Sequence, residues 1–159
     1  MNPKFIKLDK LMLAGVGTFG NVESGSPPEM WEVLRSNSLE ASDRINEPVS
    51  YGVETYTKEM QTKGKWFYMA AVEVSSFENL PAQMSGKLLP ANEYAVFTYK
   101  GAITPALGQL FQSIFKEWLP ESGFVQAGPY DLERYDHRFL GPENPDSEFD
   151  ILIPVIKAE

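Results

Sequence analysis

Residues 51–56 (YGVETY) and 130–135 (YDLERY) decide the fold, because they are one motif that occurs twice in the chain. A shift of 79 residues aligns them and matches tyrosine, glutamate and tyrosine at three positions. Both have the length and the residue types of a β-strand. Matches at a similar spacing elsewhere would indicate an internal duplication.

A second pair of predicted strands precedes this motif in each half. A shift of 80 places residues 14–21 (AGVGTFGN) on 94–101 (YAVFTYKG), with Thr18 on Thr98. Three glycines in the first segment, at 15, 17 and 20, superficially suggest a phosphate loop. We reject that motif, because no Lys-Ser/Thr pair follows and two prolines separate the glycines from the next helix.

Helices and closing strands complete the repeat. Trp31 falls on Phe111 at the shift of 80, each within a stretch of helical apolar spacing. A shift of 82 places residues 67–74 (FYMAAVEV) on 149–156 (FDILIPVI), which are apolar runs of strand length. Each half is therefore predicted as strand, helix, strand, strand.

The duplication predicts one α+β domain over residues 1–159, with pseudo-repeats at about 1–78 and 79–159. Residues 75–90 contain two prolines and a glycine without strong periodicity, and we interpret them as a connector between the halves. Residues 140–147 are predicted as a long hairpin loop.

The second helix has clearer ends than the first. Its apolar residues recur at helical spacing over 107–118. Thr104 is suited to the N-cap and Pro105 to the first helical position. The first helix is predicted around residues 28–38, with Trp31 among its buried contacts.

Composition excludes several classes of function. The 159 residues include no cysteine and one histidine, which rules out disulfides and thiolate metal sites. A net charge of −8 argues against direct nucleic-acid binding. No apolar run is long enough for a membrane helix, and no secretory signal is evident. We therefore expect a cytoplasmic protein with no cofactor, no metal site and no membrane contact.

Alternation along residues 130–135 separates two sets of side chains. One face carries Asp131, Glu133 and Tyr135, and the other carries Tyr130, Leu132 and Arg134. The matching strand places Glu54 near the same pseudo-twofold axis. A carboxylate among aromatic rings suits a lipophilic cation, through charge pairing and attraction to the ring faces. The alternative is that Glu133 is solvated and paired with Arg134 or a lysine.

Four further aromatic residues are candidates for a binding pocket. Trp31 and Phe111 occupy corresponding helix positions, and Tyr68 and Phe149 lie near the starts of the closing strands. Trp31 and Phe111 could instead simply pack on the sheet, whereas Tyr68 and Phe149 could be walls of the pocket or residues at its rim. The single histidine, His137, is expected in a solvated turn and is assigned no role.

The ordered set of motifs resembles a known family. Residues 94–101, WLPESG at 118–123, YDLERYD at 130–136 and FDILIPV at 149–155 are similar to the gyrase-inhibitor-like, or AraC-type, effector-binding domain. The resemblance implies a curved antiparallel sheet with two main helices and a central ligand pocket. It also implies that Glu133 is the buried glutamate of the multidrug-binding members.

The resulting hypothesis is a protein that captures small amphipathic, cationic organic compounds. Its proposed ligand-binding residues are Glu133, Tyr135, Trp31, Phe111, Tyr68 and Phe149. Family members fused to DNA-binding helices are regulators, but this sequence leaves no room for a helix-turn-helix segment. Two alternatives follow from the resemblance: hydrolysis of an electrophilic natural product with Glu133 as general base, and inhibition of gyrase by protein contact. A protein partner is left open.

Overall fold

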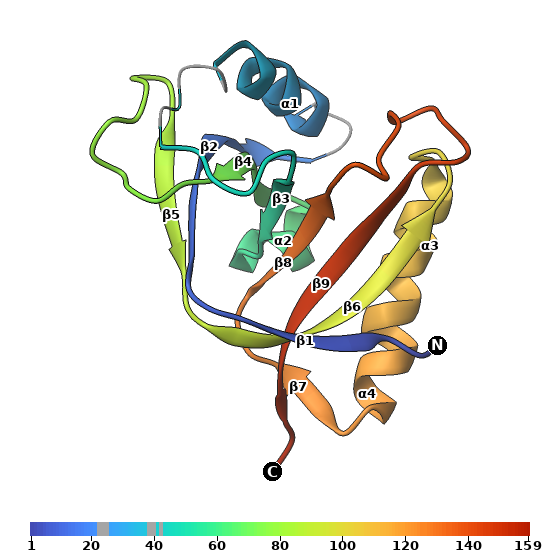
Figure 1. The fold of residues 1–159 in the computed structure, drawn as a ribbon. Coiled ribbons are helices and arrows are strands. Elements are labelled where there is room, and N and C mark those ends of the chain that lie inside the picture. Colours follow the sequence, from blue (N-terminus) through green and yellow to red (C-terminus); the bar gives the residue numbers. More distant parts are fainter. Residues whose placement is uncertain (22–25, 38–40, 42) are drawn as a thin grey trace.

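The computed structural model describes residues 1–21, 26–37, 41 and 43–159 (Figure 1). Its strands are β1 (Lys4–Leu8), β2 (Leu11–Gly20), β3 (Ser50–Thr55), β4 (Trp66–Glu73), β5 (Ser85–Leu89), β6 (Asn92–Lys100), β7 (Phe124–Gln126), β8 (Tyr130–Tyr135) and β9 (Glu148–Lys157). Its helices are α1 (Ser26–Asn37), α2 (Lys58–Lys63), α3 (Pro105–Ser113), the π-helical η3 (Ile114–Trp118) and α4 (Leu119–Glu121).

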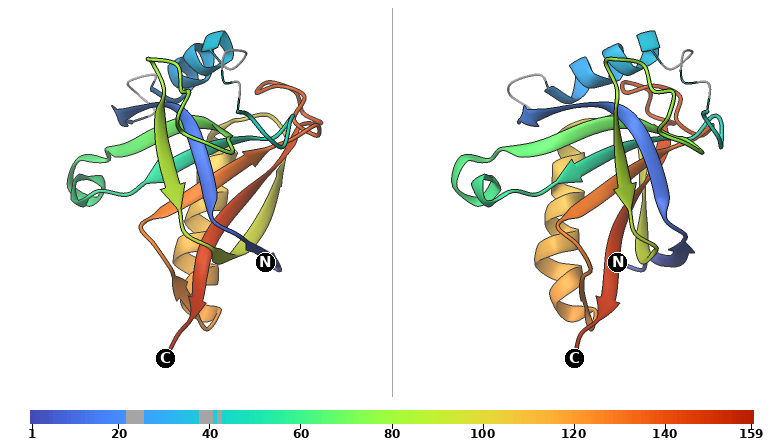
Figure 2. Two further views of the ribbon diagram at one scale, coloured as in Figure 1. Left: turned by 60° about the vertical axis from the view of Figure 1, so that its left-hand side comes forward. Right: turned by 90° about the vertical axis from the view of Figure 1, so that its left-hand side faces the viewer.

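The described strands form one antiparallel sheet in the order β1-β6-β9-β8-β3-β4-β2-β5, with β7 added beside β9. This order is symmetric about the central pair β3–β8, so β2-α1-β3-β4 and β6-α3-β8-β9 are two copies of one βαββ unit. Strands β1 and β5 are exchanged, because each pairs with the first strand of the other unit. The predicted fold class is confirmed, and Figure 2 shows the strong curvature of the sheet.

The pairing register corrects two of the sequence alignments by one residue. Thr18 lies opposite Tyr68 in β2–β4, and Phe97 lies opposite Ile151 in β6–β9. The two halves are superposed on the central pair β3–β8, and equivalent residues are then counted outward through the strand pairs. By this count Tyr68 corresponds to Ile151, and Thr18 corresponds to Phe97 rather than to Thr98. Side chains alternate between faces, so an error of one residue exchanges the two faces of a strand.

Both main helices cover the same face of the sheet. Helix α1 packs on β2 and β4 through Leu34 and neighbouring apolar residues. Helix α3 and η3 cover β6 and β9, with Ile114 fully buried against them. The opposite face carries a separate core cluster that includes Val53 and Leu132 of the central strands. The central pair β3–β8 therefore separates two layers of side chains.

The predicted boundaries hold at the second helix, with one change inside it. Thr104 is the N-cap, since its hydroxyl accepts a hydrogen bond from the amide of Ala106 at 3.3 Å, and Pro105 begins the helix. The last five residues of the predicted helix, Ile114–Trp118, are π-helical rather than α-helical. Residues 140–147 are irregular, as expected of a hairpin loop between β8 and β9.

Interpreting residues 75–90 wholly as a connector was wrong, because they contain strand β5. This edge strand has no apolar alternation, since much of it is exposed, and its position depends on pairing with β2. Strands β1 and β7 and the short helix α2 were also not predicted, for the same lack of a periodic signal. None of the helices in the described residues is long and apolar enough to cross a bilayer.

Candidate functional site

Glu133 lies on β8 at the centre of the sheet, on the face that carries the helices, and is only 5% exposed. The hydroxyls of Tyr68 and Tyr135 donate to its Oε2 at 2.9 and 3.0 Å. Burial raises the pKa of Glu133, and these two hydrogen bonds oppose the rise. The alternative of a solvated glutamate paired with Arg134 or a lysine is wrong, because Glu133 is buried and Arg134 bonds to Asp150 on the other face.

A glycine makes room for this carboxylate. Gly52 lies directly opposite Glu133 in the β3–β8 pairing. A side chain at this position would overlap both Glu133 Oε2 and the Tyr68 hydroxyl. Gly52 is thus the residue that allows the carboxylate and the hydroxyl to meet above the backbone of β3.

The predicted aromatic residues gather around the carboxylate. The indole N–H of Trp31, on α1, donates to the Tyr68 hydroxyl at 2.8 Å. The ring of Trp31 meets Tyr135 edge-on at 5.1 Å, and Tyr135 stacks on Phe149 at 4.8 Å. Glu133, Tyr135, Trp31, Tyr68 and Phe149 therefore form one contiguous group drawn from α1, β4, β8 and β9.

Phe111 lies farther along the same layer. It is on α3, partly buried, and packs against the core cluster that includes Tyr135 and Phe149. The structure therefore places it beside the aromatic group, on the side of the second helix.

Two more carboxylates share this face with Glu133. Glu54, on β3, lies directly opposite Asp131, which precedes Glu133 by two residues on β8. Burial and the charge of Glu133 raise the pKa of Glu54 to about 8. Burial, Glu54 and Glu133 also raise the pKa of Asp131. The hydroxyl of Tyr56 donates to Asp131 Oδ2.

Sequence reasoning missed part of this site. Asp131 and Glu54 were placed on the correct face by strand alternation, but neither was among the predicted ligand-binding residues. Gly52 gave no signal, because its role depends on pairing with a distant strand. Phe139, whose ring lies 4.7 Å from Tyr135, follows β8 in an irregular segment where no periodicity exists.

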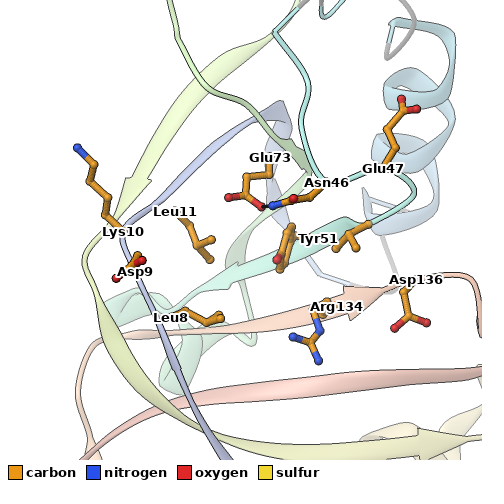
Figure 3. Close-up of a pocket in the computed structure, with 11 residues that line it drawn as sticks. Leu8, Asp9, Lys10, Leu11, Asn46, Glu47, Tyr51, Glu73, Arg134 and Asp136 are labelled. Atoms are coloured by element: carbon orange, nitrogen blue, oxygen red, sulfur yellow. Dashed lines mark hydrogen bonds between the residues drawn. The ribbon is translucent and has the colours of Figure 1, made fainter.

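A separate cavity of about 530 Å³ opens on the opposite face (Figure 3). It is lined by Leu8, Asp9, Lys10, Leu11, Asn46, Glu47, Val49, Tyr51, Glu73, Arg134 and Asp136. Glu73 accepts a hydrogen bond from Asn46 at 2.5 Å, and burial together with the charge of Glu73 raises the pKa of Tyr51 to about 12. Because Arg134 and Glu133 are adjacent on a strand, this cavity and the Glu133 group lie on different faces.

The histidine and the glycines considered in the sequence lie where the sequence analysis expected them. His137 lies exposed in the turn after β8, as expected. Gly15 and Gly17 lie within β2, where the backbone of β4 approaches them closely, which agrees with rejection of a phosphate loop. Within the described ranges, no three His, Asp or Glu side chains are grouped so that they could hold a metal ion.

Solved structures with the same fold share its arrangement but little of its sequence. SAV2435 bound to tetraphenylphosphonium has a TM-score of 0.75 and 16% identity, covering 98% of this chain and 94% of that one. EcmrR in a complex with DNA has a TM-score of 0.72 and 15% identity, covering 99% of this chain and 58% of that one. At these identities the likeness concerns the fold.

Sequence comparison identifies the family. Transcriptional regulator BrlR of Pseudomonas aeruginosa is 31% identical over 155 residues, which cover 98% of this chain and 56% of that regulator. This chain thus spans little more than half the length of that relative. Residues 4–155 match the Cass2 family, described as integron-associated effector binding protein. The chain therefore belongs to the family of integron-associated effector-binding proteins.

Proposed function

We propose that this protein binds amphipathic organic cations, with Glu133 as the counter-ion. The observation that carries the proposal is the chemistry around this buried carboxylate. Both groups that donate to its Oε2 are neutral tyrosine hydroxyls. A neutral partner satisfies hydrogen bonding without cancelling charge, so the ionised carboxylate attracts a cation strongly in its partly desolvated surroundings.

The neighbouring rings supply the rest of the recognition. Trp31, Tyr68 and Tyr135 lie within one layer around Glu133 and contact one another. Their ring faces attract a cationic centre, and Phe149 and Phe111 offer apolar surface to the body of the ligand. A compound that is both cationic and hydrophobic uses all of these contacts, whereas a hydrated inorganic cation uses few of them.

Trp31 is linked to the carboxylate through Tyr68. Its indole bonds to Tyr68, which in turn bonds to Glu133. A cation that takes a position against Glu133 must therefore displace the indole of Trp31 or share the site with it. In either case Trp31 contacts the bound cation in this proposal.

The relatives support a binding role. SAV2435 has been solved with tetraphenylphosphonium, a lipophilic cation. BrlR is a transcriptional regulator, and EcmrR has been solved with DNA, so domains of this fold also occur in DNA-binding proteins. We propose that this chain does not itself contact nucleic acid, because its net charge of −8 repels the phosphate backbone.

The test is calorimetric titration with tetraphenylphosphonium and with neutral triphenylphosphine oxide. We expect Glu133→Gln to weaken binding of the cation by about 1–3 kcal/mol and to leave the neutral compound little changed. Glu73→Gln is the matched control, because it removes a carboxylate from the cavity on the other face. Equal losses for both compounds, or a loss only in Glu73→Gln, would refute the assignment.

Hydrolysis of an electrophile is the second candidate, since burial raises the pKa of Glu133 toward the range of a general base. Turnover separates the two functions. An epoxide supplied in large excess and followed by NMR should remain intact if the protein only binds. Conversion of many equivalents that disappears in Glu133→Gln would favour the hydrolase.

A further inference from the structure

We propose that Glu54 and Asp131 form a second carboxylate position beside Glu133, and that the preferred ligands are elongated compounds with two cationic centres. This inference rests on the proposed function, because it extends the same site. It assigns the second cationic centre to a separate pair of residues, which can be tested independently of Glu133.

The geometry of the sheet sets the spacing between the two positions. Asp131 and Glu133 are two residues apart on one face of β8, and Glu54 lies opposite Asp131 on β3. Strand residues rise by about 3.3 Å each, so the two positions are about 7 Å apart along the strand. Glu54 is also the repeat equivalent of Glu133, so each half of the fold supplies one glutamate.

An unsatisfied buried atom marks the second position as a binding site. Asp131 is 0% exposed, and the Tyr56 hydroxyl donates to its Oδ2. Its other oxygen, Oδ1, has no hydrogen-bond partner within the described part of the chain. A buried acceptor without a donor is costly, and the N–H group of a bound ammonium would satisfy it.

Arg134 of β8 and Lys87 of β5 are both bonded on the face of the sheet opposite the second position. Arg134 follows Glu133 and bonds to Asp150 on the opposite face at 2.8 Å. Lys87 bonds to the Thr55 hydroxyl at 2.8 Å, and Thr55 follows Glu54 on β3. Since alternate strand residues point to opposite faces, neither cation is directed at the Glu54–Asp131 pair. Neither Arg134 nor Lys87 therefore neutralises the pair, which leaves these carboxylates to a second ligand charge in this proposal.

The second position also has its own aromatic pair. The ring of Tyr56 meets Phe115 edge-on at 6.0 Å. Phe115 lies in the π-helical turn η3, which widens the helix where it passes Tyr56. Such turns occur frequently at functional sites. Phe115 and Tyr56 beside Asp131 thus repeat the arrangement of Trp31 and Tyr135 beside Glu133.

Two matched probes test the proposal by calorimetry. N,N′-dibenzylbutane-1,4-diamine carries two ammonium groups about 6 Å apart, as five covalent bonds allow. N-benzyl-6-phenylhexan-1-amine has the same length and rings with one ammonium group. We expect the wild-type protein to bind the diamine about tenfold more tightly than the monoamine, because of the second charge pairing.

Three variants test which residues cause the preference for the diamine over the monoamine. In Glu54→Gln and in Asp131→Asn the ratio of the two affinities should fall toward one, and in Glu73→Gln it should remain as in the wild type. We expect Glu54→Gln to disturb folding less than Asp131→Asn, because Glu54 is partly exposed, whereas Asp131 is fully buried. Circular-dichroism melting of each variant checks that it folds.

The outcomes separate this inference from the proposed function. A wild-type ratio near one, or a ratio that persists in Glu54→Gln and Asp131→Asn, overturns the second position while Glu133 can still bind cations. A preference that disappears in Glu54→Gln, with monoamine binding unchanged in Glu133→Gln, supports the second position and refutes Glu133 as counter-ion. If neither amine binds the wild-type protein, both proposals are refuted.

Discussion

At the scale of single residues, the site depends on one missing side chain as much as on its polar groups. Glu133 Oε2 and the Tyr68 hydroxyl occupy the space that any larger residue at position 52 would fill. The two donors to Oε2 come from different strands, β4 and β8. Their convergence on one oxygen therefore requires both the register of the sheet and the absence of a Cβ on β3.

We predict that Gly52→Ala damages this arrangement. The added methyl group overlaps Glu133 and Tyr68, so these side chains must shift, at a cost of about 1–3 kcal/mol in the free energy of unfolding. Urea denaturation measures the loss, and calorimetry should show weaker binding of tetraphenylphosphonium.

Gly108→Ala is the control for this substitution. Gly108 is exposed within α3, and an added Cβ would meet nothing within 4 Å. We expect it to stabilise the protein by about 0.5–1 kcal/mol, because alanine favours the helix. Similar effects of the two substitutions would contradict the role given to Gly52.

At the scale of elements, α1 and α3 are related by the repeat but hold the sheet differently. Helix α3 continues into η3, whose Ile114 is fully buried. In α1, Leu34 is buried and Trp31 contributes a hydrogen bond to Tyr68. The attachment of α1 to the sheet therefore depends partly on one polar contact near the proposed ligand.

We predict that Trp31→Phe loosens α1. The change keeps an aromatic ring but removes the donor to Tyr68, whose loss should cost about 1 kcal/mol. Hydrogen exchange of the α1 amides should become faster, while exchange in α3 stays unchanged as an internal control. Equal protection of α1 in the variant and the wild type would show that this hydrogen bond does not hold the helix.

At the scale of the whole molecule, three carboxylates with raised pKa values make stability depend on pH. Burial raises the pKa of Glu54, Asp131 and Glu133 in the folded state, to about 8 for Glu54. The folded protein then binds more protons than the unfolded chain between the ordinary carboxyl values and about pH 8. Linkage makes the folded state lose stability as pH rises through this window.

We predict that the free energy of unfolding falls between pH 5 and pH 8, by at most about 1.4 kcal/mol per pH unit for each group that titrates. Urea denaturation at several pH values measures this slope. The slope should be shallower in Glu54→Gln and unchanged in Glu73→Gln. A stability that rises with pH in this range would refute the sign. A bound cation should reduce the fall, because it favours the ionised carboxylates.

The sequence predicted the features that have a local signal. Two copies of one tyrosine-glutamate-tyrosine motif indicated the duplication, and alternation placed Asp131, Glu133 and Tyr135 on one face. Thr104 and Pro105 marked the start of α3. These predictions succeeded because strand and helix periodicity, and the chemistry of a helix N-terminus, are properties of adjacent residues.

Only the tertiary structure decided the features that depend on distant pairing. The register showed that Thr18 corresponds to Phe97, and the pairing of β3 with β8 brought Gly52 beneath Glu133 and Glu54 opposite Asp131. Strands β1 and β5 each pair with a strand of the other half, and this pairing cannot be read from either segment alone. Such features arise from contacts between residues far apart in the chain, and a shift of one residue in strand pairing reverses which face each side chain joins.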